Sequence, residues 1–368
     1  MRRYDCDIVV VGAGPGGCMA AKHAALGGLD VILIEKKAEI GAPLRCAEAV
    51  PKEWLEKTGI EPDPKWICAE VAGLIMISPS GHRFTLDQSD GGSVIGYVLE
   101  RHLFDKALAE QAVAAGVRIM MRAACRGVIK EKGRITGIRA DGFEGPMEIY
   151  AKCVVAADGF ESQVPRWAGL DTNLTEDEIG TCIQYRMVNV DADQEFGELR
   201  IGSAAPGGYV WVFPKGKGRA NVGIGMQASR CRHGGDPKHH LDMYIAGDPR
   251  LKGGSVIEIV AGGVSACPGA KETVTDGLIA VGDAARVIDP ATGGGIAHAC
   301  ATGMYAGKVL VECAGSNDFS KAALMRYERM WRDDIGDRLY RSWLVKDTLY
   351  SLADDAMDDL VVSMGMLR

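Results

Sequence analysis

Glycines close to the start of the chain have the spacing of a phosphate-binding turn. Gly12, Gly14 and Gly17 form a GxGxxG pattern, and Pro15 and Gly16 lie within it. In such a pattern the first glycine permits a tight turn and the second lets the backbone approach a pyrophosphate. The third lets the following helix pack closely on a strand. The chemistry indicated is binding of a phosphate-containing cofactor.

The elements around this turn are those that it requires. A β-branched apolar run at residues 7–11 predicts a buried strand, and an alanine-rich segment at residues 18–26 predicts a helix. The N-terminus of that helix would offer free N–H groups and a positive dipole end to phosphates. Residues 31–34 predict a second strand, and Glu35 at its end can accept hydrogen bonds from ribose hydroxyls. Together these features predict a dinucleotide-binding site.

Two distant segments indicate which dinucleotide is bound. Asp158-Gly159 follows a predicted strand as a turn, and Asp283 ends another strand in a Gly-Asp-Ala sequence. With the GxGxxG pattern, and in this order, they resemble the FAD-dependent family that includes aromatic hydroxylases and geranylgeranyl reductases. The resemblance implies that FAD is the cofactor and that Asp283 binds its ribitol. It also implies that Arg101, near the start of a helix predicted over residues 98–113, contacts the FAD phosphates.

Two further loops extend the resemblance toward the flavin ring. Residues 45–49, Arg-Cys-Ala-Glu-Ala, are similar to a family loop whose cysteine lies beside the isoalloxazine. Residues 290–296 match the family's Pro-x-Thr-Gly-Gly-Gly-Ile loop on the other side, whose backbone N–H groups can stabilise charge on the reduced ring. A strand ending at Cys125 is implied near the adenine. The predicted cofactor-binding residues are Gly12, Gly14, Pro15, Gly16, Gly17, Glu35, Lys36, Arg45, Cys46, Ala47, Ala49, Arg101, Cys125, Asp158, Gly159, Asp283, Gly294, Gly295 and Ile296.

The chain contains a single GxGxxG pattern. A reductase that holds a nicotinamide as well as FAD normally carries a second one. A nicotinamide would therefore visit the FAD transiently, or electrons would come from another carrier. NAD(P)H, ferredoxin and a deazaflavin all stay open as the electron donor.

Aromatic residues alternate along a predicted strand in the second half of the chain. The rings in residues 209–214, Tyr-Val-Trp-Val-Phe-Pro, point to one face, and a Gly-x-Gly follows on the next strand. These residues could form a broad apolar wall for a long hydrocarbon, or they could fill core. The pattern is similar to the signature of geranylgeranyl reductases, most of all the archaeal digeranylgeranylglycerophospholipid reductases; enzymes that reduce the chlorophyll phytyl tail share the core motifs. The predicted substrate-binding residues are Tyr209, Trp211, Phe213, Pro214, Gly223 and Gly225.

Cys46 is the candidate catalytic residue. The resemblance implies reduction of isolated C=C bonds in isoprenoid chains, where reduced FAD delivers a hydride and a proton must reach the other alkene carbon. A thiol placed against the bond could supply that proton, and the alternative is an inert packing cysteine. Cys300, just after the glycine-rich loop, is a further candidate to lie near Cys46 and to pair with it.

Two other classes of flavoprotein share part of these sequence motifs. A monooxygenase of the aromatic-hydroxylase type would have the same fold and FAD motifs, but the Tyr-x-Trp-x-Phe-Pro signature weighs against it. An electron-transfer flavoprotein that reduces a quinone would usually carry an iron–sulfur cysteine cluster, and no such spacing occurs. We therefore favour a FAD-dependent reductase of geranylgeranyl chains, with 2,3-digeranylgeranylglycerophospholipids of archaeal membranes as its expected substrate.

The composition of the chain limits its expected partners and cell compartment. The 368 residues include 42 basic and 49 acidic side chains, a formal charge of −7, which disfavours nucleic acid as a partner. Eleven cysteines without a CxxC pair argue against a metal site and fit a reducing cytoplasm. Neither a signal peptide nor a membrane span is predicted. A lipid substrate nevertheless implies peripheral contact with the cytoplasmic membrane. The arginine-rich residues 319–368 predict helix, packed on the body or meeting anionic headgroups.

These signals predict an α/β fold, α+β overall, with a Rossmann-type FAD-binding domain, an antiparallel-sheet substrate domain and C-terminal helices. The substrate domain is expected to be antiparallel because its predicted strands lack interposed helices. The FAD-binding domain is expected to be discontinuous. The predicted boundaries are 1–75, 98–165 and 268–315 for the FAD-binding domain, 76–97 and 166–267 for the substrate domain, and 316–368 for the C-terminal helical region.

Overall fold

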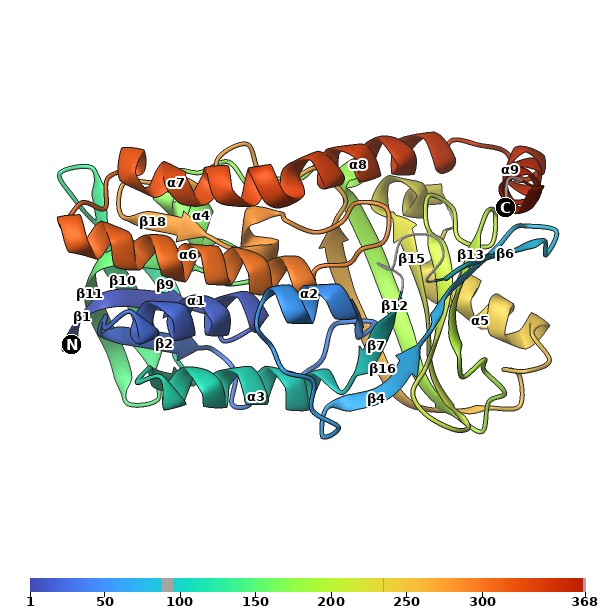
Figure 1. Ribbon diagram of the computed structural model, residues 1–368, viewed down its shortest axis with the longest axis horizontal. Helices are drawn as coiled ribbons and strands as arrows, with labels where there is room; N and C mark the ends of the chain where they lie inside the picture. Colours follow the sequence, from blue (N-terminus) through green and yellow to red (C-terminus); the bar gives the residue numbers. More distant parts are fainter. Residues whose placement is uncertain (88–94, 234, 367–368) are drawn as a thin grey trace.

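The first strands form where the apolar runs predict them. Residues 8–11 are buried in β1 (Arg2–Val11) and residues 31–34 in β2 (Val31–Glu35), since continuous β-branched runs suit strands covered on both faces. The computed structural model describes residues 1–87, 95–233 and 235–366. Figure 1 shows an elongated molecule, with one sheet and its helices at one end and a second sheet at the other.

The first sheet is Rossmann-like. β1 pairs in parallel with β2 on one side and with β11 (Gly145–Ala156) on the other, and the order β18-β11-β1-β2-β8 is parallel throughout. Helix α1 (Pro15–Leu26) packs against α3 (Arg101–Ala114) and α6 (Ile296–Ser316). The other strands are β8 (Arg118–Met121), β9 (Ala124–Glu131), β10 (Arg134–Gly142), β17 (Val274–Thr275) and β18 (Leu278–Ala280).

The second sheet has the order β16-β12-β15-β14-β13-β5-β6 and is antiparallel except where β13 pairs with β5. One face carries Val210, Val222 and Ile224, which pack on Leu241 of α5 (Pro237–Gly247). Alternate residues therefore point to the opposite face, toward the first sheet. The strands are β5 (Gly73–Ile77), β6 (Arg83–Leu86), β12 (Ile179–Val188), β13 (Phe196–Ile201), β14 (Tyr209–Pro214), β15 (Arg219–Gln227) and β16 (Ser255–Ser265).

A small third sheet and short helices complete the body. In this sheet β7 (Gly96–Leu99) lies between β3 (Ala49–Pro51) and β4 (Ile67–Val71). The remaining helices before the C-terminal region are α2 (Lys52–Lys57) and α4 (Val164–Ala168), with 3₁₀ turns at Glu176–Glu178, Ala228–His233 and Gly282–Ala285. The predicted fold class is confirmed.

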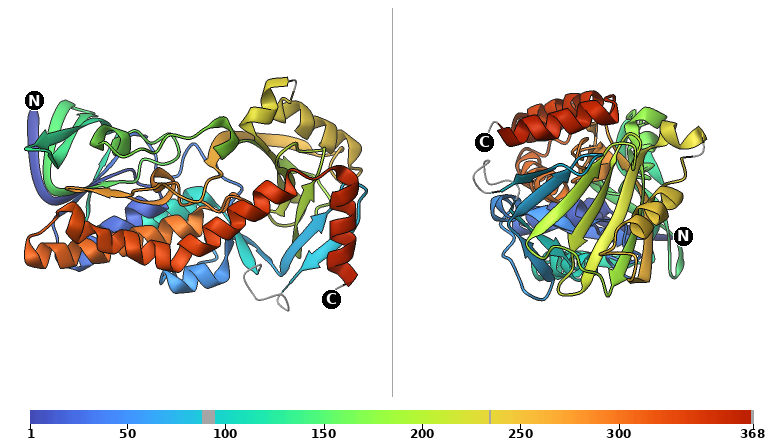
Figure 2. Two further views of the ribbon diagram at one scale, coloured as in Figure 1. Left: turned by 90° about the horizontal axis from the view of Figure 1, so that it is seen from above. Right: turned by 90° about the vertical axis from the view of Figure 1, so that its right-hand side faces the viewer.

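The C-terminal region is helical, as predicted. Tyr327, Trp331, Ile335 and Leu339 are fully buried at helical spacing along one side. Helix α8 continues along the long axis from the first sheet to the second, as Figure 1 and the left view of Figure 2 show. None of the helices within the described ranges is long and apolar enough to cross a bilayer. The helices are α7 (Lys321–Trp331), the π-turn Arg332–Gly336, α8 (Asp337–Leu349) and α9 (Asp354–Met366).

Two predicted limits differ from the structure. The helix expected from residue 98 begins at Arg101, because Val98 and Leu99 pair in β7 with strands that local sequence does not reveal. The domain boundary expected at residue 75 falls inside β5, which pairs with β13 over its whole length. We propose the same division into domains with this boundary moved to the residues before β5.

Candidate active site

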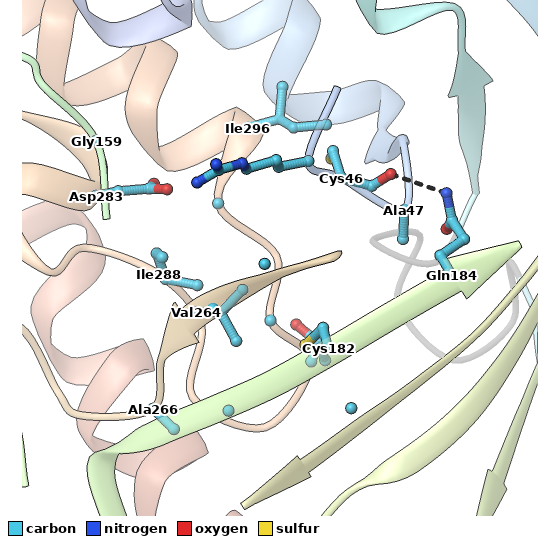
Figure 3. A pocket seen from close by; sticks show the side chains of 18 of the residues that line it. Cys46, Ala47, Gly159, Cys182, Gln184, Val264, Ala266, Asp283, Ile288 and Ile296 are labelled. Carbon is cyan, nitrogen blue, oxygen red and sulfur yellow. Dashed lines mark hydrogen bonds between the residues drawn. The ribbon is translucent and has the colours of Figure 1, made fainter. Parts of the chain in front are cut away.

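A cavity of about 380 Å³ lies where the two sheets meet. The N-terminus of α1, the loop before β3 and the residues between β18 and α6 line one side, and β12, β14, β15 and β16 line the other. Figure 3 shows Asp283 and Cys46 opposite Cys182 and Val264. The structure thus brings a part of each predicted set together. The lining residues among them are Gly14, Pro15, Gly16, Arg45, Cys46, Ala47, Arg101, Gly159, Asp283, Gly295, Ile296, Tyr209, Trp211 and Gly225.

The glycine-rich turn has room for a phosphate. Gly12 has φ +106°, and a Cβ there would lie 2.3 Å from the Ala157 carbonyl oxygen; a Cβ on Gly17 would lie 1.9 Å from the Gly12 oxygen. These two glycines are therefore required by the fold. Gly14 is different, because its φ is −78° and its Cβ would meet nothing within 4 Å. The N-terminus of α1 has neither a side-chain cap nor an acidic first turn, so its N–H groups suit a pyrophosphate.

Asp283 lies in the 3₁₀ turn after β18 and lines the cavity. Within the described residues, no group donates a hydrogen bond to its carboxylate. Burial raises the pKa of Asp283, although Arg101 and Arg286 act in the opposite direction. A carboxylate so placed needs donors from outside the chain, and sugar hydroxyls are such donors. The site therefore fits the ribitol contact predicted for Asp283.

Arg101 and Glu35 are held by their neighbours. Arg101 makes a bidentate ion pair with Asp105, with Nε and Nη2 at 2.9 and 3.1 Å from the two carboxylate oxygens. Glu35 accepts hydrogen bonds from the backbone N–H groups of Ala13 and Lys37, both at 2.9 Å. Arg101 lines the cavity and Glu35 lies behind the turn. Their contacts with phosphate and ribose stay predictions.

Other predicted residues lie away from the cavity lining. The Asp158 carboxylate accepts hydrogen bonds from the Ser162 hydroxyl at 2.7 Å and from the backbone N–H groups of Gln163 and Val164, which orients the start of α4. The Cys125 thiol donates to the Gly127 oxygen within β9. The full set outside the lining is Gly12, Gly17, Glu35, Lys36, Ala49, Cys125, Asp158, Gly294, Phe213, Pro214 and Gly223.

The predicted apolar wall consists of Tyr209 and Trp211 at the cavity. Their rings lie 5.9 Å apart edge to face, and the Tyr209 hydroxyl donates to the Thr292 oxygen. Trp211 lies over Gly223, where a Cβ would come within 2.2 Å of the indole. Gly223 therefore makes room for the ring and does not itself face the cavity. Phe213 shares the face and is buried further along the strand.

Cys46 is fixed at the cavity through its sulfur and its carbonyl. The Glu48 backbone N–H donates to Cys46 Sγ at 3.2 Å, and Gln184 Nε2 donates to the Cys46 oxygen at 3.2 Å, the dashed line of Figure 3. Burial raises the pKa of the Cys46 thiol, although the nearby Arg101 lowers it in part. The thiol is thus protonated at neutral pH. All eleven cysteines are free, so the hypothesised pairing of Cys46 with Cys300 is not formed.

Several lining residues were not predicted from the sequence. Gly180, Cys182 and Gln184 face the cavity from alternate positions of β12, and Lys346 and Tyr350 reach it from the end of α8. The alternation in β12 was a usable signal, because residues i, i+2 and i+4 share one face of a strand. Lys346 and Tyr350 had no local signal, since only the packing of α8 across both sheets brings them to the cavity.

Two family models match overlapping parts of the chain. Residues 7–203 match the model described as FAD dependent oxidoreductase. Residues 178–264, which hold β12 to β16, match the model described as geranylgeranyl reductase catalytic domain. The protein is a FAD-dependent oxidoreductase.

Relatives similar over nearly the whole chain show which family of FAD-dependent oxidoreductases this is. A digeranylgeranylglycerophospholipid reductase of Thermoplasma volcanium is 44% identical over 96% of this chain and 90% of its own. Digeranylgeranylglycerophospholipid reductase 1 of Methanococcoides burtonii is 45% identical over 97% and 87%. The crystal structure of a geranylgeranyl bacteriochlorophyll reductase-like protein from Thermoplasma acidophilum superimposes with a TM-score of 0.95 at 42% identity, covering 98% of this chain and 92% of that one. The chain belongs to the geranylgeranyl reductase family.

Proposed function

We propose that this protein saturates the C=C bonds of geranylgeranyl chains in 2,3-digeranylgeranylglycerophospholipids, with FAD as its cofactor. The observation that carries the proposal is that predicted FAD-binding residues and the Tyr209–Trp211 wall line one and the same cavity. The full-length likeness to digeranylgeranylglycerophospholipid reductases supports the choice of lipid.

Reduced FAD, when bound, supplies a hydride. The chain has to hold an isolated alkene beside it, exclude water and provide a proton to the second carbon. Tyr209, Trp211 and Cys182 offer a mostly apolar surface for the alkene. We assign the proton to the Cys46 thiol, because burial keeps it protonated and its sulfur and carbonyl are both held by hydrogen bonds. Positioned proton transfer of this kind typically contributes about 10²–10⁴-fold to a rate.

Small residues make this cavity suitable for a chain that moves. Gly180, Gly225, Gly262 and Gly263 line it from three neighbouring strands. Neighbouring side chains occupy the space beside three of these glycines: Val264 beside Gly180, Cys182 beside Gly225 and Phe160 beside Gly263. The glycines therefore let those side chains pack closely on the sheet, and the strands themselves add no bulky groups to the cavity wall at these positions. Successive reductions along one chain require sliding past this wall, so the glycine lining supports a polyprenyl substrate over a compact aromatic one.

We propose that the protein meets the membrane through the outer face of α8. Tyr340, Leu344 and Val345 are exposed there, and Arg341 lies among them. The inner face of the same helix reaches the cavity through Lys346, so a lipid bound at this face would have a short path to the site. Sedimentation with anionic vesicles tests the contact: Leu344→Glu should reduce the bound fraction, and unchanged binding would contradict it.

The electron donor is open to a direct test. Anaerobic reduction of the bound flavin, followed by absorbance, would compare NAD(P)H, ferredoxin and a deazaflavin as donors.

The function is tested with chemically reduced enzyme and a geranylgeranylated glycerophospholipid. Mass spectrometry of the recovered lipid should show gains in steps of two hydrogens. A gain of one oxygen atom, with oxygen consumption, would indicate a monooxygenase, and an unchanged lipid mass would refute the proposal.

A further inference from the structure

An ion pair is buried beside the Cys46 loop. Lys215, which directly follows β14, and Glu48 are each 1% exposed, and Lys215 Nζ lies 2.7 Å from Glu48 Oε2. Removing two charges from water is costly unless their geometry is good and further hydrogen bonds satisfy them. A pair buried this deeply is therefore expected to have further contacts that compensate for its desolvation.

Both oxygens of the Glu48 carboxylate have further donors. The Arg101 backbone N–H donates to Oε1 at 2.9 Å, and Asn221 Nδ2 donates to Oε2 at 2.8 Å. Lys215 also donates to the Leu99 oxygen and lies 3.3 Å from a Glu100 oxygen. The carboxylate therefore links the start of α3 to β14 and β15, two strands of the second sheet.

The backbone at Glu48 is strained. Its φ is +75°, in the left-handed region that residues other than glycine rarely adopt. Such a conformation persists only when its surroundings determine it. Here the strain lies two residues from Cys46, and the Glu48 N–H is the group that donates to the Cys46 sulfur. The contacts that hold Glu48 therefore also set the place of the thiol.

The second sheet holds the two preceding residues as well. Asn221 Nδ2 lies 3.2 Å from the Ala47 oxygen, and Gln184 Nε2 lies 3.2 Å from the Cys46 oxygen. Gln184 is oriented in turn by Trp211, whose Nε1 donates to its Oε1 at 2.9 Å. The loop and the apolar wall are thus connected by side-chain hydrogen bonds at three consecutive residues.

We propose that Glu48 and Lys215 are positioning residues: their buried ion pair holds the left-handed turn that keeps the Cys46 thiol at the cavity. The inference rests on the proposed function, in which Cys46 supplies the proton. Glu48→Gln keeps the side-chain shape but replaces one oxygen by an NH₂ group that would face donors on either side. The thiol should then lose its fixed position.

The test compares Glu48→Gln with Glu198→Gln in FAD-loaded enzyme. Glu198 is the matched control because it is also 1% exposed and its oxygens lie 2.7 and 2.9 Å from Arg250. It belongs to β13 of the second sheet and lies outside the cavity lining. Both variants should melt at a lower temperature. Only Glu48→Gln should lower kcat, by about tenfold or more with KM within about twofold, and change the rate at which iodoacetamide alkylates Cys46 by about fivefold. Mass spectrometry of the Cys46 peptide measures that rate.

The proposal is overturned if Glu48→Gln leaves kcat and Cys46 alkylation within about twofold of the wild type, or if Glu198→Gln changes them equally. Should Glu48→Gln fail to fold, the double variant Glu48→Gln/Lys215→Met removes the ion pair and leaves no unpaired buried charge, and it should alter Cys46 alkylation in the same direction. Alkylation requires no turnover. A wild-type enzyme that leaves the lipid unchanged would therefore refute the proposed function, while the comparison of alkylation rates would still decide the positioning role.

Discussion

Replacing Gly14 by alanine should separate cofactor binding from folding. The added Cβ meets no atom within 4 Å, and a φ of −78° is one that alanine adopts freely. Alanine reduces the entropy of the unfolded chain but is a poorer helix N-cap than glycine. These opposed effects leave the stability of the FAD-free protein within about 0.5 kcal/mol of the wild type.

The affinity for FAD, unlike the stability, should change in the Gly14→Ala variant. If the pyrophosphate approaches the backbone at Gly14, the methyl group occupies its place, and overpacking of this kind costs about 1–3 kcal/mol. That range corresponds to about 5- to 150-fold weaker binding. Gly12→Ala gives the contrast, because φ +106° and a 2.3 Å approach to the Ala157 oxygen would strain the fold itself. It should destabilise the FAD-free protein by more than about 1 kcal/mol.

Two measurements are needed. Thermal melting of FAD-free protein gives the stability of each variant, and calorimetric titration with FAD gives its affinity. Gly14→Ala should have the melting temperature of the wild type and bind FAD more weakly, whereas Gly12→Ala should have a lower melting temperature. The reasoning is refuted if Gly14→Ala binds FAD within about twofold of the wild type, since the open space beside Gly14 would then not be where the pyrophosphate lies.

Further predictions concern the carboxylate, the thiol and pH. Asp283→Asn should weaken FAD binding by about 10- to 100-fold without destabilising the FAD-free protein, since it removes a charge in the cavity wall whose pKa is raised by desolvation; calorimetry with unchanged affinity would contradict this. Cys46→Ala should lower kcat by about 10²–10⁴-fold with FAD content unchanged; Cys182→Ala, in the same cavity, is the control, and equal loss in both would count against a role specific to Cys46. Burial lowers the pKa of His298 to about 4, and Arg338 adds to this while Asp289 opposes it. The unfolded chain, where histidine titrates near 6.5, then binds a proton that the folded chain does not. The free energy of unfolding should therefore fall between about pH 6.5 and pH 4, by on the order of 2–3 kcal/mol. Urea unfolding at several pH values measures this, and His298→Gln should flatten the profile; an equally steep profile in that variant would refute the assignment.

The sequence alone determined the cofactor-binding half of the protein. Gly14 and Gly17 act through local geometry, because the turn, the strand before it and the helix after it are contiguous in the chain. Gly12 is in addition required by the approach of the distant Ala157 carbonyl oxygen. The alternation of Tyr209 and Trp211 likewise follows from the period of a strand. Features of this kind can be predicted from the sequence because they depend on neighbours within a few residues.

Only the tertiary structure decided which side chains converge. Asp158 and Asp283 look equivalent as acidic residues after strands, yet Asp158 is engaged with the start of α4 and Asp283 faces the cavity. Cys182 faces the cavity because of how β12 is placed in the second sheet. Glu48 and Lys215 are 167 residues apart and meet only when the Cys46 loop packs on that sheet. Such contacts depend on strand order and on the docking of one sheet against the other, which no local pattern encodes.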